Sequence, residues 1–88
     1  MNVEVLFFGR LRELATRQRV VSMIGGARLS DLIDRLSEEY GDEFRREVNQ
    51  LEGLRILING NEYDLLDGMA TSLKDGDVVV FLTITAGG

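Results

Sequence analysis

The feature of this chain best suited to chemistry is its carboxyl end, where Gly87 and Gly88 follow Ala86. A carboxylate that enters another protein's active site must pass every constriction on its path, and each Cβ widens the chain there. Glycine has no Cβ and adopts backbone conformations closed to other residues. The α-carboxylate is ionised at neutral pH, so an enzyme that aligns it with ATP could direct it at the α-phosphate to form an acyl-adenylate. The alternative is a frayed end without a chemical role.

Composition limits the classes of protein to consider. With 88 residues, 44% apolar and 28% charged, the chain fits one small globular domain. The longest uninterrupted apolar run, residues 78–82, is too short to span a bilayer, and the first residues lack the pattern of a secretory signal. We therefore expect a cytoplasmic protein without membrane contact. A net charge of −5 argues against nucleic-acid binding and favours basic protein surfaces as partners.

Two residue types that dominate catalytic sites are missing from the sequence. With no cysteine and no histidine, the chain has neither a thiol nucleophile nor an imidazole base, and it lacks the usual soft metal ligands. These absences exclude most self-contained catalytic schemes, and we expect no bound cofactor or metal. Its central carboxylates are interpreted as a solvated face: Asp31, Asp34, Glu38, Glu39, Asp42, Glu43 and Glu47.

The first half of the chain predicts two strands and a helix. Residues 2–8 are dense in Val, Leu and Phe and predict a central strand, followed by a short helical turn over 10–15 and a second strand over 18–24. Gly25 and Gly26 indicate a loop. The main helix is predicted from apolar residues at i, i+3, i+4, i+7 and i+11, with its start between Arg28 and Asp31 and its stop at Gly41.

The second half predicts a hairpin and a last strand. Residues 42–52 favour a short helix or an ordered loop, and residues 54–58 a strand. Asn59 and Gly60 predict a type I′ turn, with a return strand over 62–65. The last strand runs from 78 to about 83. The order β-β-α-β-β-β, with the first and last strands parallel and central, predicts an α+β fold.

The sequence motifs in this order resemble the MoaD/ThiS family of ubiquitin-like sulfur carriers, most of all the small subunits of molybdopterin synthases. Residues 5–14 (VLFFGRLREL) are similar to the family's first strand and turn, residues 73–78 (LKDGDV) to the turn before its last strand, and the diglycine to its tail. The resemblance covers essentially the whole chain. It implies a ubiquitin-like β-grasp of four to five strands packed on one main helix, with residues 1–82 as the domain and 83–88 as a flexible tail.

The resemblance also implies that the chain is a carrier and a protein substrate rather than an enzyme, and it implies the partners. A ubiquitin-activating-type adenylating enzyme would use ATP to activate the carboxylate of Gly88, and a sulfur donor protein would convert it to a thiocarboxylate. The tail would then enter the large subunit of molybdopterin synthase and give its sulfur to a pterin precursor.

The resemblance assigns roles to residues near the tail. Ala86 and Gly87 would line the threading path, and Phe81 and Leu82 would form an apolar docking surface. For Phe81 the alternative is core packing, which we also expect of Phe7 and Phe8. Arg10 and Arg12 are interpreted either as surface charges or as a polar rim of the docking surface.

One departure from the family leaves the acceptor of the sulfur open. Many relatives have prolines shortly before the tail, whereas residues 82–86 read LTITA here. The alternatives are a sulfur carrier for thiamine or tRNA thiolation, a modifier conjugated through Gly88 to lysines, and a β-grasp interaction domain whose tail is idle.

Overall fold

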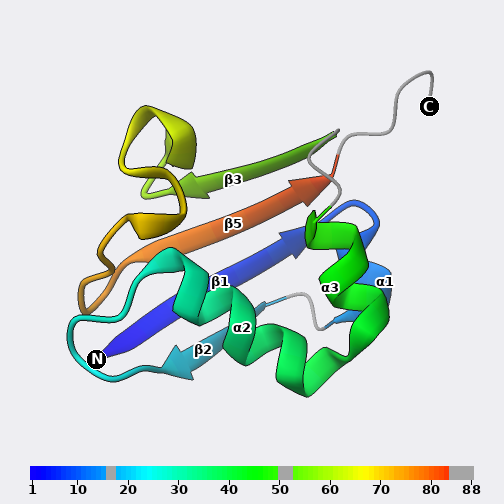
Figure 1. Cartoon of the computed structure of the whole chain (residues 1–88), viewed down its shortest axis with the longest axis horizontal. Coiled ribbons are helices and arrows are strands. Elements are labelled where there is room, and N and C mark those ends of the chain that lie inside the picture. The colour runs from blue at the N-terminus through cyan, green and yellow to red at the C-terminus, as the bar shows by residue number, and fades with distance from the viewer. Residues whose placement is uncertain (16–17, 50–52, 84–88) are drawn as a thin grey trace.

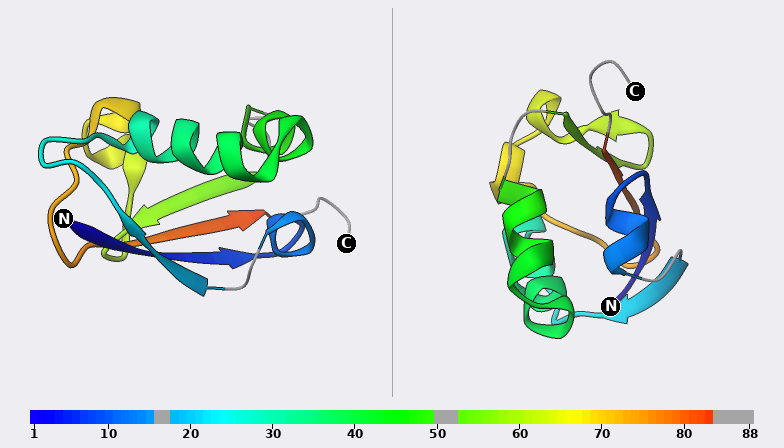
Figure 2. Two further views of the ribbon diagram at one scale, coloured as in Figure 1. Left: turned by 90° about the horizontal axis from the view of Figure 1, so that it is seen from below. Right: turned by 90° about the vertical axis from the view of Figure 1, so that its right-hand side faces the viewer.

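A five-stranded mixed sheet carries the helices on one of its faces (Figure 1, Figure 2). The computed structural model describes residues 1–15, 18–49 and 53–83. The strands are β1 (Asn2–Phe8), β2 (Gln18–Ser22), β3 (Leu54–Ile58), β4 (Asn61–Glu62) and β5 (Val78–Thr83). Their order is β2-β1-β5-β3-β4, with β1 and β5 parallel and the other neighbours antiparallel. The predicted mixed sheet, with the first and last strands central, is confirmed.

Burial alternates along the central strands, because successive side chains point to opposite faces of a sheet. The inward residues of β1 and β5 are all fully buried: Val3, Val5, Phe7, Val79 and Phe81. The residues between them face away from the helices. β2 is shorter than predicted and ends at Ser22, where the backbone N–H of Met23 donates a hydrogen bond to the carbonyl oxygen of Met1 at 2.7 Å.

The main helix, α2 (Leu29–Tyr40), lies across the sheet and buries the predicted apolar stripe. Asp31 caps its first turn by accepting a hydrogen bond from the backbone N–H of Arg28 at 2.8 Å. The helix ends before Gly41, whose φ of 95° favours glycine. The sequence placed the start of this helix between Arg28 and Asp31, and in the structure the helix starts at Leu29.

Two shorter helices complete this layer. α1 (Leu11–Leu14) confirms the helical turn that was predicted after β1. The sequence allowed either a helix or a loop over residues 42–52, and the structure has a helix there, α3 (Asp42–Asn49). Phe44 and Val48, one turn apart on α3, are both buried. Of the helices described, none has the length and apolar character needed to cross a membrane.

The hairpin after β3 differs in part from the prediction. Asn59 and Gly60 have φ angles of 51° and 85°, the positive values that a type I′ turn requires. The predicted return strand is present but its bounds differ from 62–65, because β4 begins at Asn61 and ends at Glu62, where a 3-10 turn, η1 (Tyr63–Leu65), follows. Leaving the extended conformation lets Tyr63 pack against the core. A second 3-10 turn, η2 (Gly68–Ala70), precedes the loop to β5.

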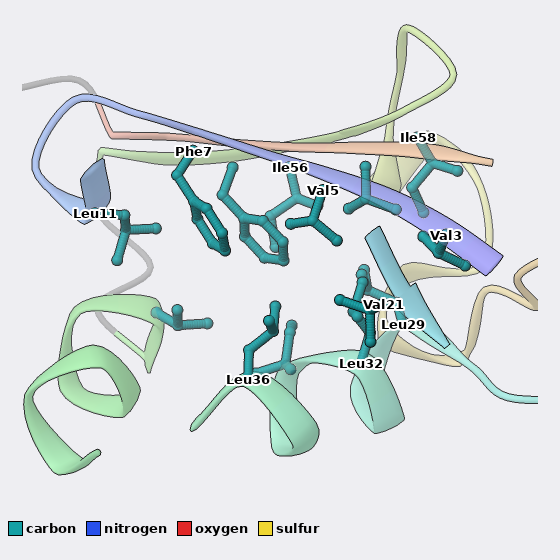
Figure 3. Close-up of a cluster of buried hydrophobic side chains, with 14 of the residues drawn as sticks. Val3, Val5, Phe7, Leu11, Val21, Leu29, Leu32, Leu36, Ile56 and Ile58 are labelled. Carbon is teal, nitrogen blue, oxygen red and sulfur yellow. The ribbon is translucent and has the colours of Figure 1, made fainter. Parts of the chain in front are cut away.

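The core fills the space between the sheet and the helices (Figure 3). Phe7 is at its centre, with ring centroids 5.5 Å from the stacked ring of Phe81 and 5.8 Å from the edge-on ring of Phe44. These contacts join β1, β5 and α3. The strand that leads to the carboxyl end of the chain is thus fixed by the same packing that fixes the sheet.

Candidate functional site

The end of β5 is anchored by the turn that follows β1. The backbone N–H of Arg10 donates a hydrogen bond to Oγ1 of Thr83 at 2.6 Å. Gly9 has a φ of 69°, and a Cβ added there would lie 2.4 Å from both the carbonyl oxygen and Oγ1 of Thr83. Only glycine lets the two segments approach this closely. The position of the residue from which the tail leaves is therefore set by Gly9 and Arg10.

The tail itself lies outside the described residues, and so do the positions to which the sequence assigned its chemistry: Ala86, Gly87 and Gly88. Thr83, which was predicted to begin the tail, is the last residue of β5. The structure thus shows where the tail starts and what holds that point, and the roles of the three terminal residues stay predictions.

The two residues predicted to form a docking surface point to opposite faces of the sheet. Phe81 is fully buried and stacks on Phe7, so its side chain packs in the core and takes no part in an exposed surface. Leu82 is half-buried on the outward face. The prediction that Phe8 is a core residue is wrong, since Phe8 is 37% exposed, whereas that for Phe7 is confirmed.

The outward face of the central strands carries a set of partly exposed apolar side chains, which we call the open-face patch. Its members are Leu6, Phe8, Leu57, Val80 and Leu82. Register brings them together: Val80 of β5 is paired with Leu6 of β1 and Leu57 of β3, and Leu82 is paired with Phe8. Within the described ranges, no helix covers this face in either view of Figure 2. The open-face patch ends beside Thr83, so a protein bound to it would lie next to the start of the tail.

Polar pairs flank the open-face patch on two sides. Nε2 of Gln18 donates a hydrogen bond to Oε1 of Glu4 at 2.6 Å, and Arg55 forms an ion pair with Glu62 on the other side. Arg10, one of the two arginines considered for a rim, instead forms an ion pair with Glu47 of α3 at 3.0 Å. The rim of the patch is therefore built from strand residues. Arg12, the other arginine considered, is exposed on α1.

A hollow of about 610 Å³ lies between the loop after β2 and the polar side of α2. Its lining includes Ser22, Ile24, Asp34 and Arg35. Ser22 is paired with Asn2, the first residue of β1, so the hollow is at the opposite end of the sheet from Thr83. It has no part in the site around the tail.

The titratable groups with displaced pKa values join β2 to α2 and lie apart from the open-face patch. A hydrogen bond from Arg19 lowers the pKa of Glu39 below its usual value, and Arg35 adds to the effect. The hydrogen bonds that Arg19 makes to Glu39 and Tyr40 raise its own pKa. Among the described residues, no group of three potential ligands could hold a metal ion.

Comparison with known proteins identifies the family to which the chain belongs. The model of the ThiS family matches residues 5–88. The chain belongs to the ThiS family. This match runs from the middle of β1 through both terminal glycines, and it confirms the resemblance to ThiS/MoaD-type ubiquitin-like sulfur carriers that the sequence motifs indicated.

Three relatives match this ThiS-family protein over its full length. The chain is 34% identical to small archaeal modifier protein 3 of Haloferax volcanii, with all of both proteins covered. The solution structure of a Haloferax volcanii protein has a TM-score of 0.83 and 32% identity, and covers 100% of this chain and 87% of that one. A chain in the complex of subunits 1 and 2 of the molybdopterin-converting factor of Helicobacter pylori has a TM-score of 0.65 and 31% identity, with all of both chains covered.

These likenesses confirm the ubiquitin-like β-grasp fold and place the protein among small carriers and modifiers. The sequence motifs identified the family, whereas most of the open-face patch was missed. Leu6 was predictable in principle, since it alternates with the inward-facing Val5 and Phe7. Gly9 was recognised only as the end of a strand, and its contact with Thr83 has no local signal because the two residues are distant in sequence.

Proposed function

We propose that this ThiS-family protein is a sulfur carrier for molybdopterin biosynthesis that acts as the small subunit of a molybdopterin synthase. The observation that carries the proposal is the full-length similarity to a chain of the Helicobacter pylori molybdopterin-converting factor complex. The diglycine end, the anchored Thr83 and the open-face patch support it. Together they provide a carboxylate for activation and an apolar surface for docking beside it.

Activation begins at the carboxylate of Gly88. One carboxylate oxygen attacks the α-phosphorus of ATP, a new phosphorus–oxygen bond forms, and pyrophosphate leaves. A sulfur nucleophile then attacks the carbonyl carbon of the acyl-adenylate, and AMP leaves with the electron pair of the broken bond. The product is a thiocarboxylate. With no cysteine or histidine in the chain, the adenylating enzyme and the sulfur donor supply the acid, base and sulfur groups.

The open-face patch serves as the docking surface for the large subunit. Apolar side chains on neighbouring strands provide a contiguous area whose removal from water stabilises the complex by roughly 25 cal/mol per Å². Arg55 and Glu62 supply polar contacts at its edge. Since Thr83 adjoins Leu82, docking on this face would aim the tail at the partner's active site.

The decisive experiment follows the intact mass of the chain. The purified protein is incubated with a ubiquitin-activating-type adenylating enzyme, ATP and sulfide, beside a variant that lacks Gly88. We expect the full-length chain alone to gain the mass difference between sulfur and oxygen. An unchanged mass, with an enzyme that is active on another carrier, would refute the carrier function.

A second experiment tests the acceptor. The thiocarboxylated chain is mixed with the large subunit and the pterin precursor, and we expect sulfur to appear in the pterin as the chain returns to its original mass. Transfer to a thiazole or a tRNA in place of the pterin would support the alternative sulfur acceptors.

Similarity to small archaeal modifier protein 3 favours a second candidate function, conjugation to other proteins. The same acyl-adenylate would then react with lysine amines in place of sulfur. No arginine or lysine follows Lys74, so trypsin would leave residues 75–88 as a branch on each modified lysine. Detection of this branch on cellular proteins would show conjugation, and its absence under activating conditions would refute it.

A further inference from the structure

The primary amines of this protein are very few. Of its ten basic residues nine are arginines, and Lys74 is the one lysine in the sequence. A guanidinium stays protonated at any physiological pH, whereas a lysine amine is a common target of acylation. An activated carboxylate near this protein would therefore meet one side-chain amine.

Lys74 begins a rigid turn just before β5. Its backbone N–H donates a hydrogen bond to Oδ2 of Asp77 at 2.8 Å, and the backbone N–H of Asp77 donates one to the carbonyl oxygen of Lys74 at 3.1 Å. Gly76 donates its backbone N–H to the carbonyl oxygen of Asn2 at 2.8 Å, which ties the turn to β1. The backbone at Lys74 is thus held in place.

The side chain of Lys74 is exposed. The carboxylates nearest to it in sequence bind other groups, because Oδ1 of Asp75 accepts a hydrogen bond from the backbone N–H of Asn2 at 2.7 Å and Oδ1 of Asp77 accepts one from Asn59 at 2.9 Å. No ion pair involves Lys74 in the part of the chain that the structure describes. Its amine is therefore accessible to a reagent.

The other primary amine is held by the fold. The α-amine of Met1 donates a hydrogen bond to the carbonyl oxygen of Met23 at 2.8 Å and is partly buried. An attack through this nitrogen would break the contact between the start of β1 and the loop after β2. Lys74 is thus the better placed of the two nucleophiles.

Lys74 and the start of the tail lie at opposite ends of the sheet. Between them β5 runs from Val78 to Thr83, a distance of about 17 Å at a rise of about 3.3 Å per residue. Residues 84–88 extend at most about 18 Å, so a tail that doubled back along β5 would reach only to the level of Val78. The geometry therefore favours Lys74 of a second copy over Lys74 of the same copy.

We propose that Lys74 is a modification site that accepts the C-terminal carboxylate of another copy of this chain, so that copies join head to tail. The inference rests on the proposed activation of Gly88. The Nζ atom of Lys74 attacks the carbonyl carbon of the acyl-adenylate and an amide bond forms. AMP leaves with the electron pair of the broken carbon–oxygen bond, and the nitrogen loses a proton to solvent. The open-face patch lies between the two ends.

The test uses a matched pair of variants. Lys74→Arg keeps the positive charge and removes the nucleophilic amine. The wild-type chain and K74R are each incubated with the adenylating enzyme and ATP in the absence of sulfide, and pyrophosphate exchange is measured alongside dimer formation. We expect equal exchange in both, dimers only in the wild type, and a branch of residues 75–88 on Lys74 after trypsin digestion. Dimers in K74R, or exchange without dimers in the wild type, would overturn the proposal.

A second experiment tests acylation of Lys74 independently of the proposed enzymatic activation of Gly88. A K74R chain that carries a chemically installed thioester at Gly88 provides an activated carboxylate without any enzyme and without a Lys74 amine of its own. Mixed with unmodified wild-type chain, it is expected to form the amide at Lys74, and with K74R it is expected to form none. Absence of pyrophosphate exchange would refute the proposed activation alone, whereas failure of the thioester to acylate Lys74 would refute the modification site.

Discussion

The contact between Gly9 and Thr83 shows how one missing side chain positions the candidate site. A Cβ at Gly9 would overlap the carbonyl oxygen and Oγ1 of Thr83 at 2.4 Å, in a backbone conformation that L-residues rarely adopt. We expect Gly9→Ala to lower the free energy of unfolding by about 1 to 3 kcal/mol. Urea unfolding followed by circular dichroism measures this change.

A matched control is available at a second glycine. A Cβ at Gly25 meets no atom within 4 Å, so Gly25→Ala is expected to leave the stability almost unchanged. Equal effects of the two substitutions would show that the close approach of Gly9 to Thr83 does not matter for stability.

At the scale of elements, the ion pair between Arg19 of β2 and Glu39 of α2 links an outer strand to the main helix. Because the pKa of Glu39 is lowered in the folded protein, its contribution to stability is complete above the unfolded-state pKa of about 4.3 and is lost as the pH falls through the lower folded-state value. We expect Glu39→Gln to cost about 0.5 kcal/mol at neutral pH, in the range of exposed pairs. In urea unfolding at a series of pH values, the cost should vanish in acid.

The neighbouring Glu38 provides the control for this pH dependence. Glu38 forms no ion pair among the described residues, and Glu38→Gln is expected to have little effect at any pH. A difference between wild type and E39Q that persists unchanged below pH 4 would contradict the role given to the ion pair.

The open face of the sheet is the second prediction at this scale. If the open-face patch docks the large synthase subunit, Val80→Ser is expected to weaken that complex at least tenfold, about 1.4 kcal/mol, as measured by calorimetry. Leu65→Ser changes a residue that is 80% exposed and lies in η1, so the affinity should stay the same. A loss of affinity in Leu65→Ser but not in Val80→Ser would place the docking surface on the side of η1.

The sequence predicted the elements better than it predicted their faces. β1 and β3 have the predicted bounds, because glycine, asparagine and other turn residues delimit them. Phe81 and Leu82 belong to an unbroken apolar run, in which no polar residue marks the outward positions. Which of them points inward is decided by pairing with β1 and β3, and those contacts are distant in sequence.

At the scale of the whole molecule, β5 joins the two halves of the sheet, because it lies between β1 and β3. A chain that ends after Asp77 is expected to be unfolded by circular dichroism, because it lacks both the sheet's central partner and the buried Val79 and Phe81. A chain that ends after Thr83 keeps all of these contacts, and we expect its free energy of unfolding to match that of the full chain. A folded chain ending after Asp77 would refute this view of β5.

The parallel pairing of β1 with β5 has a consequence for how the protein is made. A ribosome releases β1 first and β5 last of the described strands. The two central strands can therefore pair only after β5 has left the ribosome, since contacts this distant in sequence must wait for the later partner. A chain whose synthesis stops before β5 therefore cannot close the sheet, and its inward-facing β1 residues stay exposed to solvent and to other chains.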